Sequence, residues 1–222
     1  MPAFGQTKLQ IINAVLPRLR EATVATSSST TYAALISSLV NVVKTQIEAA
    51  WQWRDLRDTY TVTAVPGTTS YTLTSSGQFA QIIDVWNTTT GRKVARGTTH
   101  GFNKKFFGQT PVQTGDVREY NPVGLDGSYD VVIDTWPNVT ASNVLKVNLY
   151  LPAADPATDA TVILVPNQIL IEGVIAYAMA ERGDDNGIGV QMQMEIYQRM
   201  LGDAIAAEIG QDSSEADWTP DA

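Results

Sequence analysis

Residues 32–55 read YAALISSLVNVVKTQIEAAWQWRD, and the period of their hydrophobic side chains changes within this stretch. Apolar residues recur every three or four positions as far as Trp51, which predicts an amphipathic helix of about six turns. After Trp51 the period falls to two, which is typical of a β-strand. Trp51 falls on the apolar stripe and is expected in the core, whereas Trp53 lies on another face of the helix. We therefore expect a junction between a helix and a β domain at Trp51 and Trp53, with Trp53 seating the β part.

A shorter helix is expected before this one. Thr7 and Gln10 have the spacing of a capping box, and apolar residues follow at helical intervals at Leu9, Ile12, Leu16 and Leu19. Pro17 is expected to kink the helix, because an interior proline removes a backbone donor and clashes with the preceding turn. The Ser/Thr-rich residues 26–31 offer N-caps for the helix that follows.

A long region of alternating residues follows the second helix. Tyr60 and Val62 alternate with polar neighbours before the turn at 66–69, and Tyr71 and Leu73 alternate after it, which predicts a hairpin. Turns rich in Gly, Pro, Asn and Asp separate the other short segments of this kind. Further strands are expected at residues 82–87, 92–95, 117–122, 129–136 and 144–151. Several short antiparallel strands predict a small sandwich or barrel.

Helical periodicity returns at residues 169–181 and 192–209, and Pro166 suits a first helical turn. Short helices from the two chain ends cannot bury their apolar stripes alone, so they should pack together. The predicted fold class is α+β: an antiparallel helical bundle from both chain ends, an inserted antiparallel β-sandwich or barrel-like domain, and an extended C-terminal tail. The expected domains are N-terminal helices in 1–57, the β domain in 58–165, C-terminal helices in 166–210 and the tail in 211–222.

Composition argues against most enzyme chemistry. The 222 residues include no Cys and one His, which removes thiol nucleophiles, Cys/His zinc sites and most imidazole acid–base chemistry. The spacing identifies no catalytic partner for His100, so a structural or surface role is favoured. Asp130 and Asp134 would lie roughly 13 Å apart along one strand, too far for the usual glycosidase pair. The sequence therefore predicts no catalytic residue, no cofactor, no metal and no enzyme activity.

The net charge of −8 is concentrated near the C-terminus. Residues 171–222 carry eleven acidic and two basic side chains, whereas residues 1–170 carry twelve acidic and thirteen basic ones. An acidic surface repels phosphate backbones, so affinity for nucleic acid is not expected. The segment FNKKFF at 102–107 could grip a nucleic-acid backbone, but we favour an amphipathic turn whose phenylalanines close one end of the β domain. Neither a signal peptide nor a membrane span is expected.

The tail has one large apolar side chain, Trp218, with Glu215 and Asp217 beside it. A lone aromatic residue in such a segment is often an anchor for a partner. The alternative is a solubilising end that contacts nothing. Trp218, Asp217 and Glu215 are therefore candidate contacts for another protein.

Three segments resemble the head-to-tail adaptor proteins of short-tailed bacteriophages, a group of head completion and connector proteins that includes tail tubular protein A. They read LQIINAVLPRLRE at 9–21, EAAWQWRDLR at 48–57 and AYAMAERGDD at 176–185. The resemblance covers nearly the whole chain, and its motifs are packing and turn signatures.

This resemblance implies a structural virion protein located at the phage neck, and in the host cytoplasm during assembly. It implies a ring, commonly of twelve copies, between the portal protein and the tail nozzle protein. The helical part would line a channel through which genomic DNA passes without specific binding. The C-terminal segment, with Trp218, would reach the portal or a neighbouring copy.

A different class of function stays open at this point. The β domain could be a glycan or host-receptor binding module of a phage tail, with Trp86, Trp136 and Tyr129 as a stacking platform. Such a module would not require the long flanking helices.

Overall fold

The chain forms an α+β structure in two compact units. The computed structural model describes residues 5–108, 113–183 and 188–212. One unit, the helical unit, combines residues 1–55 with 153–222, and the other, the β unit, spans residues 56–152. Residues 153–165, which were expected in the β domain, group with the helices, because they hydrogen-bond to the first helix and its neighbours.

The helical unit contains α1 (Lys8–Val15), α2 (Thr31–Ala50), α4 (Asn167–Arg182) and α5 (Ile188–Asp212). The predicted capping box is present at α1: the Gln10 amide donates to Thr7 Oγ1 at 3.3 Å, and the Thr7 amide donates to Gln10 Oε1 at 2.9 Å. Thr30 caps α2 by accepting from the Ala33 amide at 3.0 Å. Pro17 does not kink a longer helix, because α1 ends at Val15 and Pro17 lies in a 3₁₀ turn, Leu16–Leu19.

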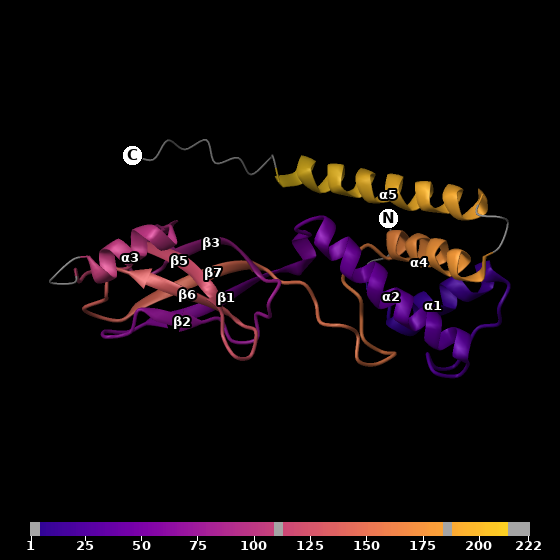
Figure 1. Cartoon of the computed structure of the whole chain (residues 1–222), viewed down its shortest axis with the longest axis horizontal. Helices are drawn as coiled ribbons and strands as arrows, with labels where there is room; N and C mark the ends of the chain where they lie inside the picture. Colours follow the sequence, from indigo (N-terminus) through magenta and orange to yellow (C-terminus); the bar gives the residue numbers. More distant parts are fainter. Residues whose placement is uncertain (1–4, 109–112, 184–187, 213–222) are drawn as a thin grey trace. The chain divides into compact units, whose positions relative to one another are not determined.

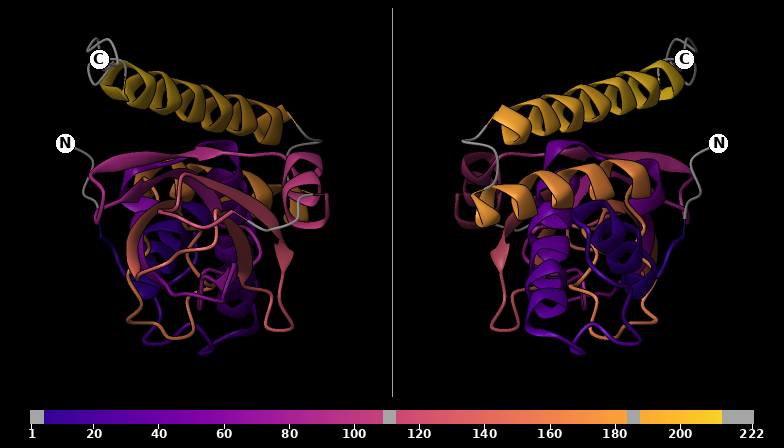
Figure 2. Two further views of the ribbon diagram at one scale, coloured as in Figure 1. Left: turned by 90° about the vertical axis from the view of Figure 1, so that its left-hand side faces the viewer. Right: turned by 90° about the vertical axis from the view of Figure 1, so that its right-hand side faces the viewer.

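Helix α4 lies between α5 and the pair formed by α1 and α2 (Figures 1 and 2). Because α4 is covered from more than one side, its residues 169–176 form an unbroken buried run, without the polar face of a surface helix. The chain reaches α4 from residues 153–165, where the Lys8 amide donates to the Thr161 carbonyl at 3.0 Å. The central helix is therefore contributed by the C-terminal part of the chain and two of its neighbours by the N-terminal part.

Gly173 allows this close packing. A Cβ atom at Gly173 would lie 2.6 Å from Cγ1 of Val43 in α2 and 2.9 Å from Cε2 of Tyr197 in α5. Both distances are shorter than van der Waals contact, so only glycine lets the three helices approach as they do. The intrinsic cost of glycine within a helix is about 1 kcal/mol relative to alanine, and packing outweighs it here.

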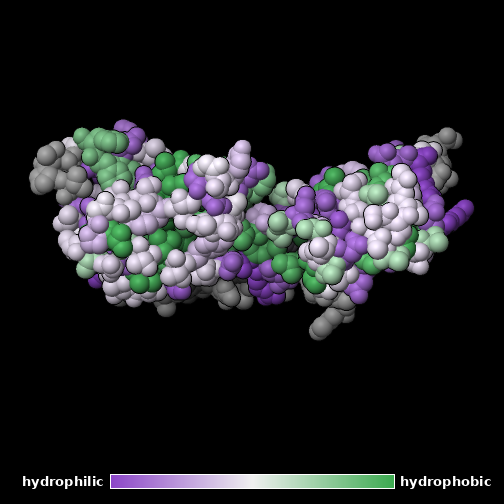
Figure 3. Space-filling view, turned by 90° about the horizontal axis from the view of Figure 1, so that it is seen from below, coloured by the Kyte–Doolittle hydropathy of each residue, from purple (hydrophilic) through white to green (hydrophobic). Residues whose placement is uncertain are grey.

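The β unit is a nearly closed, barrel-like sheet of seven strands: β1 (Arg57–Ala64), β2 (Ser70–Thr72), β3 (Gln81–Asn87), β4 (Arg92–Arg96), β5 (Glu119–Leu125), β6 (Val131–Trp136) and β7 (Asn143–Tyr150). The strand order is β1-β7-β3-β4-β5-β6-β2, and only the β4–β5 pair is parallel. Alternating residues point into one core, which includes Val85, Ile133 and Leu145. Weakly polar residues cover most of the visible face of this unit, with separate hydrophobic patches between them (Figure 3).

The predicted hairpin is wrong. β1 pairs with β7 and β2 pairs with β6, so the turn at 65–69 connects strands at the two ends of the sheet order. Tyr71 bridges this corner, because its hydroxyl accepts from the Val65 amide at 2.9 Å and donates to the Thr68 carbonyl at 2.7 Å. Alternation of residues predicts a strand but not which strand pairs with it. Here β1 pairs with β7, whose residues Leu145, Val147 and Leu149 are buried.

Two local predictions also need correction. Residues 102–107, where a short amphipathic turn was expected, belong to the nine-residue helix α3 (Thr99–Phe107). Thr98 caps this helix, because its side chain accepts from the Gly101 amide at 3.2 Å. Helix α5 continues through residues 211 and 212, which were expected in the tail. In both places helical hydrogen bonds form in a segment whose sequence pattern is short or weak.

We predict that Gly173→Ala lowers the free energy of unfolding by about 1–3 kcal/mol, because the added methyl group overpacks the contact with Val43 and Tyr197. Gly202→Ala in α5 is the matched control. A Cβ at Gly202 meets no atom within 4 Å, so the higher helix propensity of alanine should raise stability by about 0.5–1 kcal/mol. Urea denaturation of both variants measures the two effects, and equal shifts of the same sign would contradict the packing argument.

Candidate interaction surfaces

The burial of the two junction tryptophans differs from expectation, since Trp51 was expected in the core. α2 ends at Ala50, and Trp51 is extended and only half-buried. Trp53 is 3% exposed, and its Nε1 donates to the Ile47 carbonyl at 2.7 Å. This carbonyl belongs to the last turn of α2, where no further helical amide is available. Trp53 therefore closes the end of α2, two residues before the division between the units.

A buried ion pair holds the chain where it re-enters the helical unit. Lys44 and Glu48 lie one turn apart on α2, and their side chains are 3% and 4% exposed. Lys44 Nζ donates to Glu48 Oε2 at 3.0 Å and to the Ala153 carbonyl at 2.6 Å. Burial raises the pKa of Glu48 against the opposing effect of Lys44. The lysine thus fixes residue 153 against α2.

A second polar cluster, centred on Glu172, joins the 3₁₀ turn Leu16–Leu19, α4 and α5. Arg18 Nη1 and Gln168 Nε2 donate to Glu172 Oε1 at 2.6 and 2.7 Å. Gln193 Nε2 of α5 donates to Glu172 Oε2 at 2.6 Å. Burial opposes the charge on Glu172, but the hydrogen bonds from Arg18 and Gln193 outweigh it, so the pKa of Glu172 is lowered. The inner side of α5 is attached through this cluster and through Tyr197.

The outer side of α5 carries an exposed apolar stripe. Ile188, Met192 and Ile196 are spaced by four residues and therefore share one helix face. They are 67%, 62% and 41% exposed. Large apolar side chains grouped in this way mark contact sites for other molecules more often than scattered ones do. This stripe was not predicted from the sequence, although the four-residue spacing of its members is visible there.

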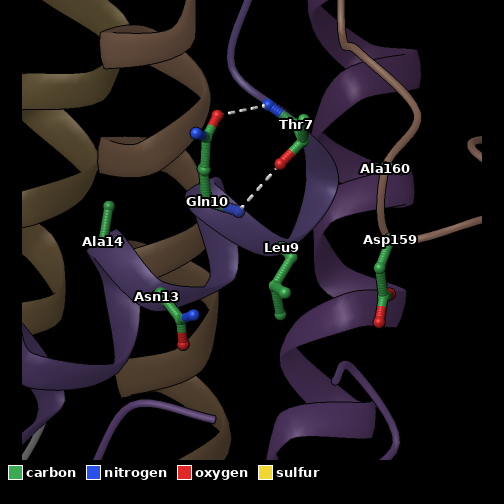
Figure 4. Close-up of a pocket in the computed structure, with 7 residues that line it drawn as sticks. All are labelled: Thr7, Leu9, Gln10, Asn13, Ala14, Asp159 and Ala160. Carbon is green, nitrogen blue, oxygen red and sulfur yellow. Dashed lines mark hydrogen bonds between the residues drawn. The ribbon is translucent and has the colours of Figure 1, made fainter. Parts of the chain in front are cut away.

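An open groove of about 650 Å³ lies at the start of α1 (Figure 4), lined by Thr7, Leu9, Gln10, Asn13, Ala14, Asp159 and Ala160. Its polar groups already have partners within the chain. Thr7 and Gln10 cap the helix, Asn13 bonds to both backbone groups of Val24, and Asp159 Oδ2 accepts from the Ser27 amide at 2.9 Å. Because the hydrogen-bonding groups of the groove are already bonded within the chain, the groove is a poor site for a polar ligand.

The proposed stacking platform of aromatic residues is not assembled. Trp86 is 43% exposed on β3, but Trp136 lies on β6, three strand positions away and therefore about 14 Å across the sheet. Lys105 Nζ lies 4.3 Å from the centre of the Trp136 ring and covers it. Tyr129 is exposed in the turn that precedes β6, at the end of that strand away from Trp136. These three residues do not form one continuous binding face.

Helix α3 uses Phe102 and Lys105 for packing. Phe102 is buried, whereas Phe107 is exposed, so only some of the phenylalanines close the barrel. Lys105 forms an ion pair with Glu119 of β5. His100 is exposed in the first turn of the helix. A nucleic-acid site would need both lysines and the aromatic rings free on one surface. In α3, Lys105 and Phe102 are engaged within the β unit instead.

Asp130 is engaged by the backbone of a neighbouring turn. Asp130 accepts hydrogen bonds from the amides of Ser75 and Gly77 at 2.8 and 3.0 Å, and these bonds lower its pKa. Its carboxylate therefore holds the 73–77 turn.

Within the described ranges, no three His, Asp or Glu side chains gather closely enough to bind a metal ion. None of the described helices has the length and hydrophobicity to cross a membrane.

The candidate partner contacts Glu215, Asp217 and Trp218 lie outside the described residues. The model of the SU10 adaptor protein family matches residues 6–221 of the chain. No curated protein matches the chain significantly. The match includes the helical unit, the β unit and nearly all of the C-terminal segment.

We predict that Lys44→Met lowers the free energy of unfolding by roughly 3–5 kcal/mol, because it leaves the Glu48 carboxylate buried without its cation. The double variant Lys44→Met/Glu48→Leu should recover most of this loss, since neither charge is then buried. Chemical denaturation at neutral pH measures both. If the double variant is no more stable than the single one, the loss does not come from the unpaired Glu48 carboxylate.

A further prediction concerns acid sensitivity. The folded-state pKa of Glu172 is lowered, so its contribution to stability is present above its usual pKa near 4.5 and is lost as the pH falls through the folded value. Glu172→Gln should melt at a lower temperature than the wild type at about pH 6, and the two should converge towards about pH 3. The raised pKa of Glu48 changes stability with pH in the opposite direction, but Glu48 is present in both proteins, so its effect cancels in the comparison. Parallel pH curves would contradict this assignment.

Proposed function

The chain belongs to the SU10 adaptor protein family, and from this membership we propose that it forms the ring that joins the portal protein to the tail nozzle of a phage. At the coarser level the protein is a structural adaptor of a bacteriophage, which associates with other head and tail proteins in the virion. The ring is proposed to contain twelve copies, as the sequence resemblance implies, and to assemble in the host cytoplasm. Family membership over residues 6–221 is the observation that carries this proposal.

The distribution of charge supports a DNA channel through the ring. The residues of the helical unit include sixteen acidic and seven basic side chains, whereas those of the β unit include seven acidic and eight basic ones. A channel wall of like charge to DNA lets the duplex slide without binding to phosphates. We therefore propose that the helical unit lines the channel and that genomic DNA passes without specific contacts.

The contacts of such a ring need exposed surfaces on each copy. The stripe of Ile188, Met192 and Ile196 on α5 is one candidate, because three large apolar side chains on one face favour a protein partner. Trp218, with Asp217 and Glu215, is a second candidate, for contact with the portal or a neighbouring copy. Trp51 and Trp53 remain the proposed junction between the helices and the β domain.

The alternative of a glycan or receptor module has weaker support. It would depend on Trp86 alone, because Trp136 is covered by Lys105 and Tyr129 lies in the turn before the opposite end of β6. One exposed tryptophan does not make the extended platform that stacking against several sugar rings requires. The adaptor function therefore fits the described surfaces better.

We expect the purified protein to stay small alone at micromolar concentration and to form a closed ring when the portal protein of its phage is added. The sixteen acidic residues of each helical unit repel those of the next copy, and the portal must offset this repulsion. Native mass spectrometry of the protein with and without portal measures the copy number. A closed ring without portal at low salt would contradict this dependence, and no association with portal would contradict the proposed function.

A further inference from the structure

The end of the β unit near the β3–β4 turn contains a pocket of about 390 Å³ whose wall is basic. Three of its residues carry a positive charge, and these come from β4 and from the segment that leads into β5. The lining residues are Thr90, Arg92, Lys93, Asp116, Val117 and Arg118. The pocket is thus formed by two segments that are neighbours in the sheet but separate in the sequence.

Two buried asparagines hold these segments in place. Asn87 Nδ2 donates to Asn143 Oδ1 at 2.9 Å and to the Val117 carbonyl at 3.2 Å, and the Val117 amide donates to Asn143 Oδ1 at 2.9 Å. Asn87 Oδ1 also accepts from the amides of Thr89 and Thr90. Asn87 and Asn143 are 0% and 1% exposed, so this network is shielded from water. The shape of the pocket is therefore fixed before any ligand arrives.

No described residue neutralises the positive charge of the pocket. Arg92, Lys93 and Arg118 are exposed, and none of them forms an ion pair with a described residue. Asp116, the one acidic residue of the lining, has its Oδ1 engaged by Asn143 Nδ2 at 3.2 Å. Three cations around one carboxylate leave an excess of two positive charges. The pocket thus favours an anionic partner.

An exposed indole lies beside one of these cations, Lys93. Lys93 stands directly opposite Trp86 in the β3–β4 pair, and Lys146 stands opposite Trp86 on the other side, in the β3–β7 pair. Side chains in such directly opposed positions are within about 5 Å of each other at Cβ. The surface therefore combines carboxylate-binding groups with an exposed apolar ring.

We propose that this pocket, with Trp86, binds the C-terminal residues 211–222 of a neighbouring copy. These twelve residues contain four acidic side chains and one tryptophan, which complement the three cations and the exposed indole in both charge and apolar character. Arg92 and Arg118 suit this ligand because guanidinium groups bind carboxylates through two parallel hydrogen bonds. Every copy carries both the donor and the acceptor of this contact, so the contact can repeat from copy to copy. It rests on the proposed function only in requiring that copies of the chain lie side by side.

The test uses the full-length protein and a fluorescently labelled synthetic peptide of residues 211–222. Anisotropy should show saturable binding that unlabelled peptide displaces and that weakens as salt is raised from about 50 to 200 mM. The double variant Arg92→Glu/Arg118→Glu should bind the peptide at least tenfold more weakly. Lys104→Glu/Arg199→Glu changes the net charge equally at exposed residues outside the pocket, and should bind nearly as the wild type does. Circular dichroism checks that both variants fold.

The specificity of the contact is tested with altered ligands. A peptide with Trp218→Ala should bind more weakly than the natural sequence, because it lacks the ring that packs on Trp86. Equal competition by an unrelated peptide of the same charge, by inorganic phosphate at the same ionic strength or by duplex DNA would overturn the assignment to the tail. So would the absence of saturable binding or an equal loss in both double variants. If the wild-type protein still assembles on the portal, these results overturn this inference alone and not the adaptor function.

Discussion

The close approach of three helices at Gly173 is the constraint on which the helical unit depends. α4 contacts helices on more than one side, and the absence of a side chain at Gly173 leaves room for Val43 of α2 and Tyr197 of α5. The neighbouring Glu172 adds hydrogen bonds from Arg18 and Gln193 at the same level of the helix. Steric fit thus sets the spacing of the helices, and the polar cluster fixes their rotation and register. The apolar stripe of α5 faces outward as a consequence.

The β unit depends on a different constraint, the closure of its sheet. The two strands that follow one another at 57–72 do not pair, and the turn between them crosses to the other end of the strand order. Tyr71 satisfies backbone groups at this corner, and Asp130 does so at the 73–77 turn. A nearly closed sheet leaves few unpaired strand edges, which protects against edge-to-edge aggregation. The buried Asn87–Asn143 network belongs to the same sheet and shapes its basic end.

The two units differ in the kind of surface that they offer. The helical unit carries most of the acidic residues and an apolar stripe, whereas the β unit is close to neutral and concentrates three unpaired cations around one pocket. Charge of opposite sign on separate parts of one chain favours contacts between copies of that chain. The described polar clusters hold helices and turns in place. This structural use of polar residues agrees with membership in a family of phage adaptor proteins.

The sequence by itself determined those features that depend on neighbouring residues. The capping box at Thr7 and Gln10, the long helix α2 and most of the strands follow from local spacing, as does the α+β class. Tertiary structure alone decided that Trp53 is buried and Trp51 is not, because the chain leaves α2 at Ala50 and turns back to its last carbonyls. It also decided the partners of β1 and β2, the use of Lys105 against Trp136, and the gathering of Arg92 and Arg118 around one pocket. These depend on contacts between residues far apart in the chain, and alternation or spacing within one segment carries no information about which distant segment will lie beside it.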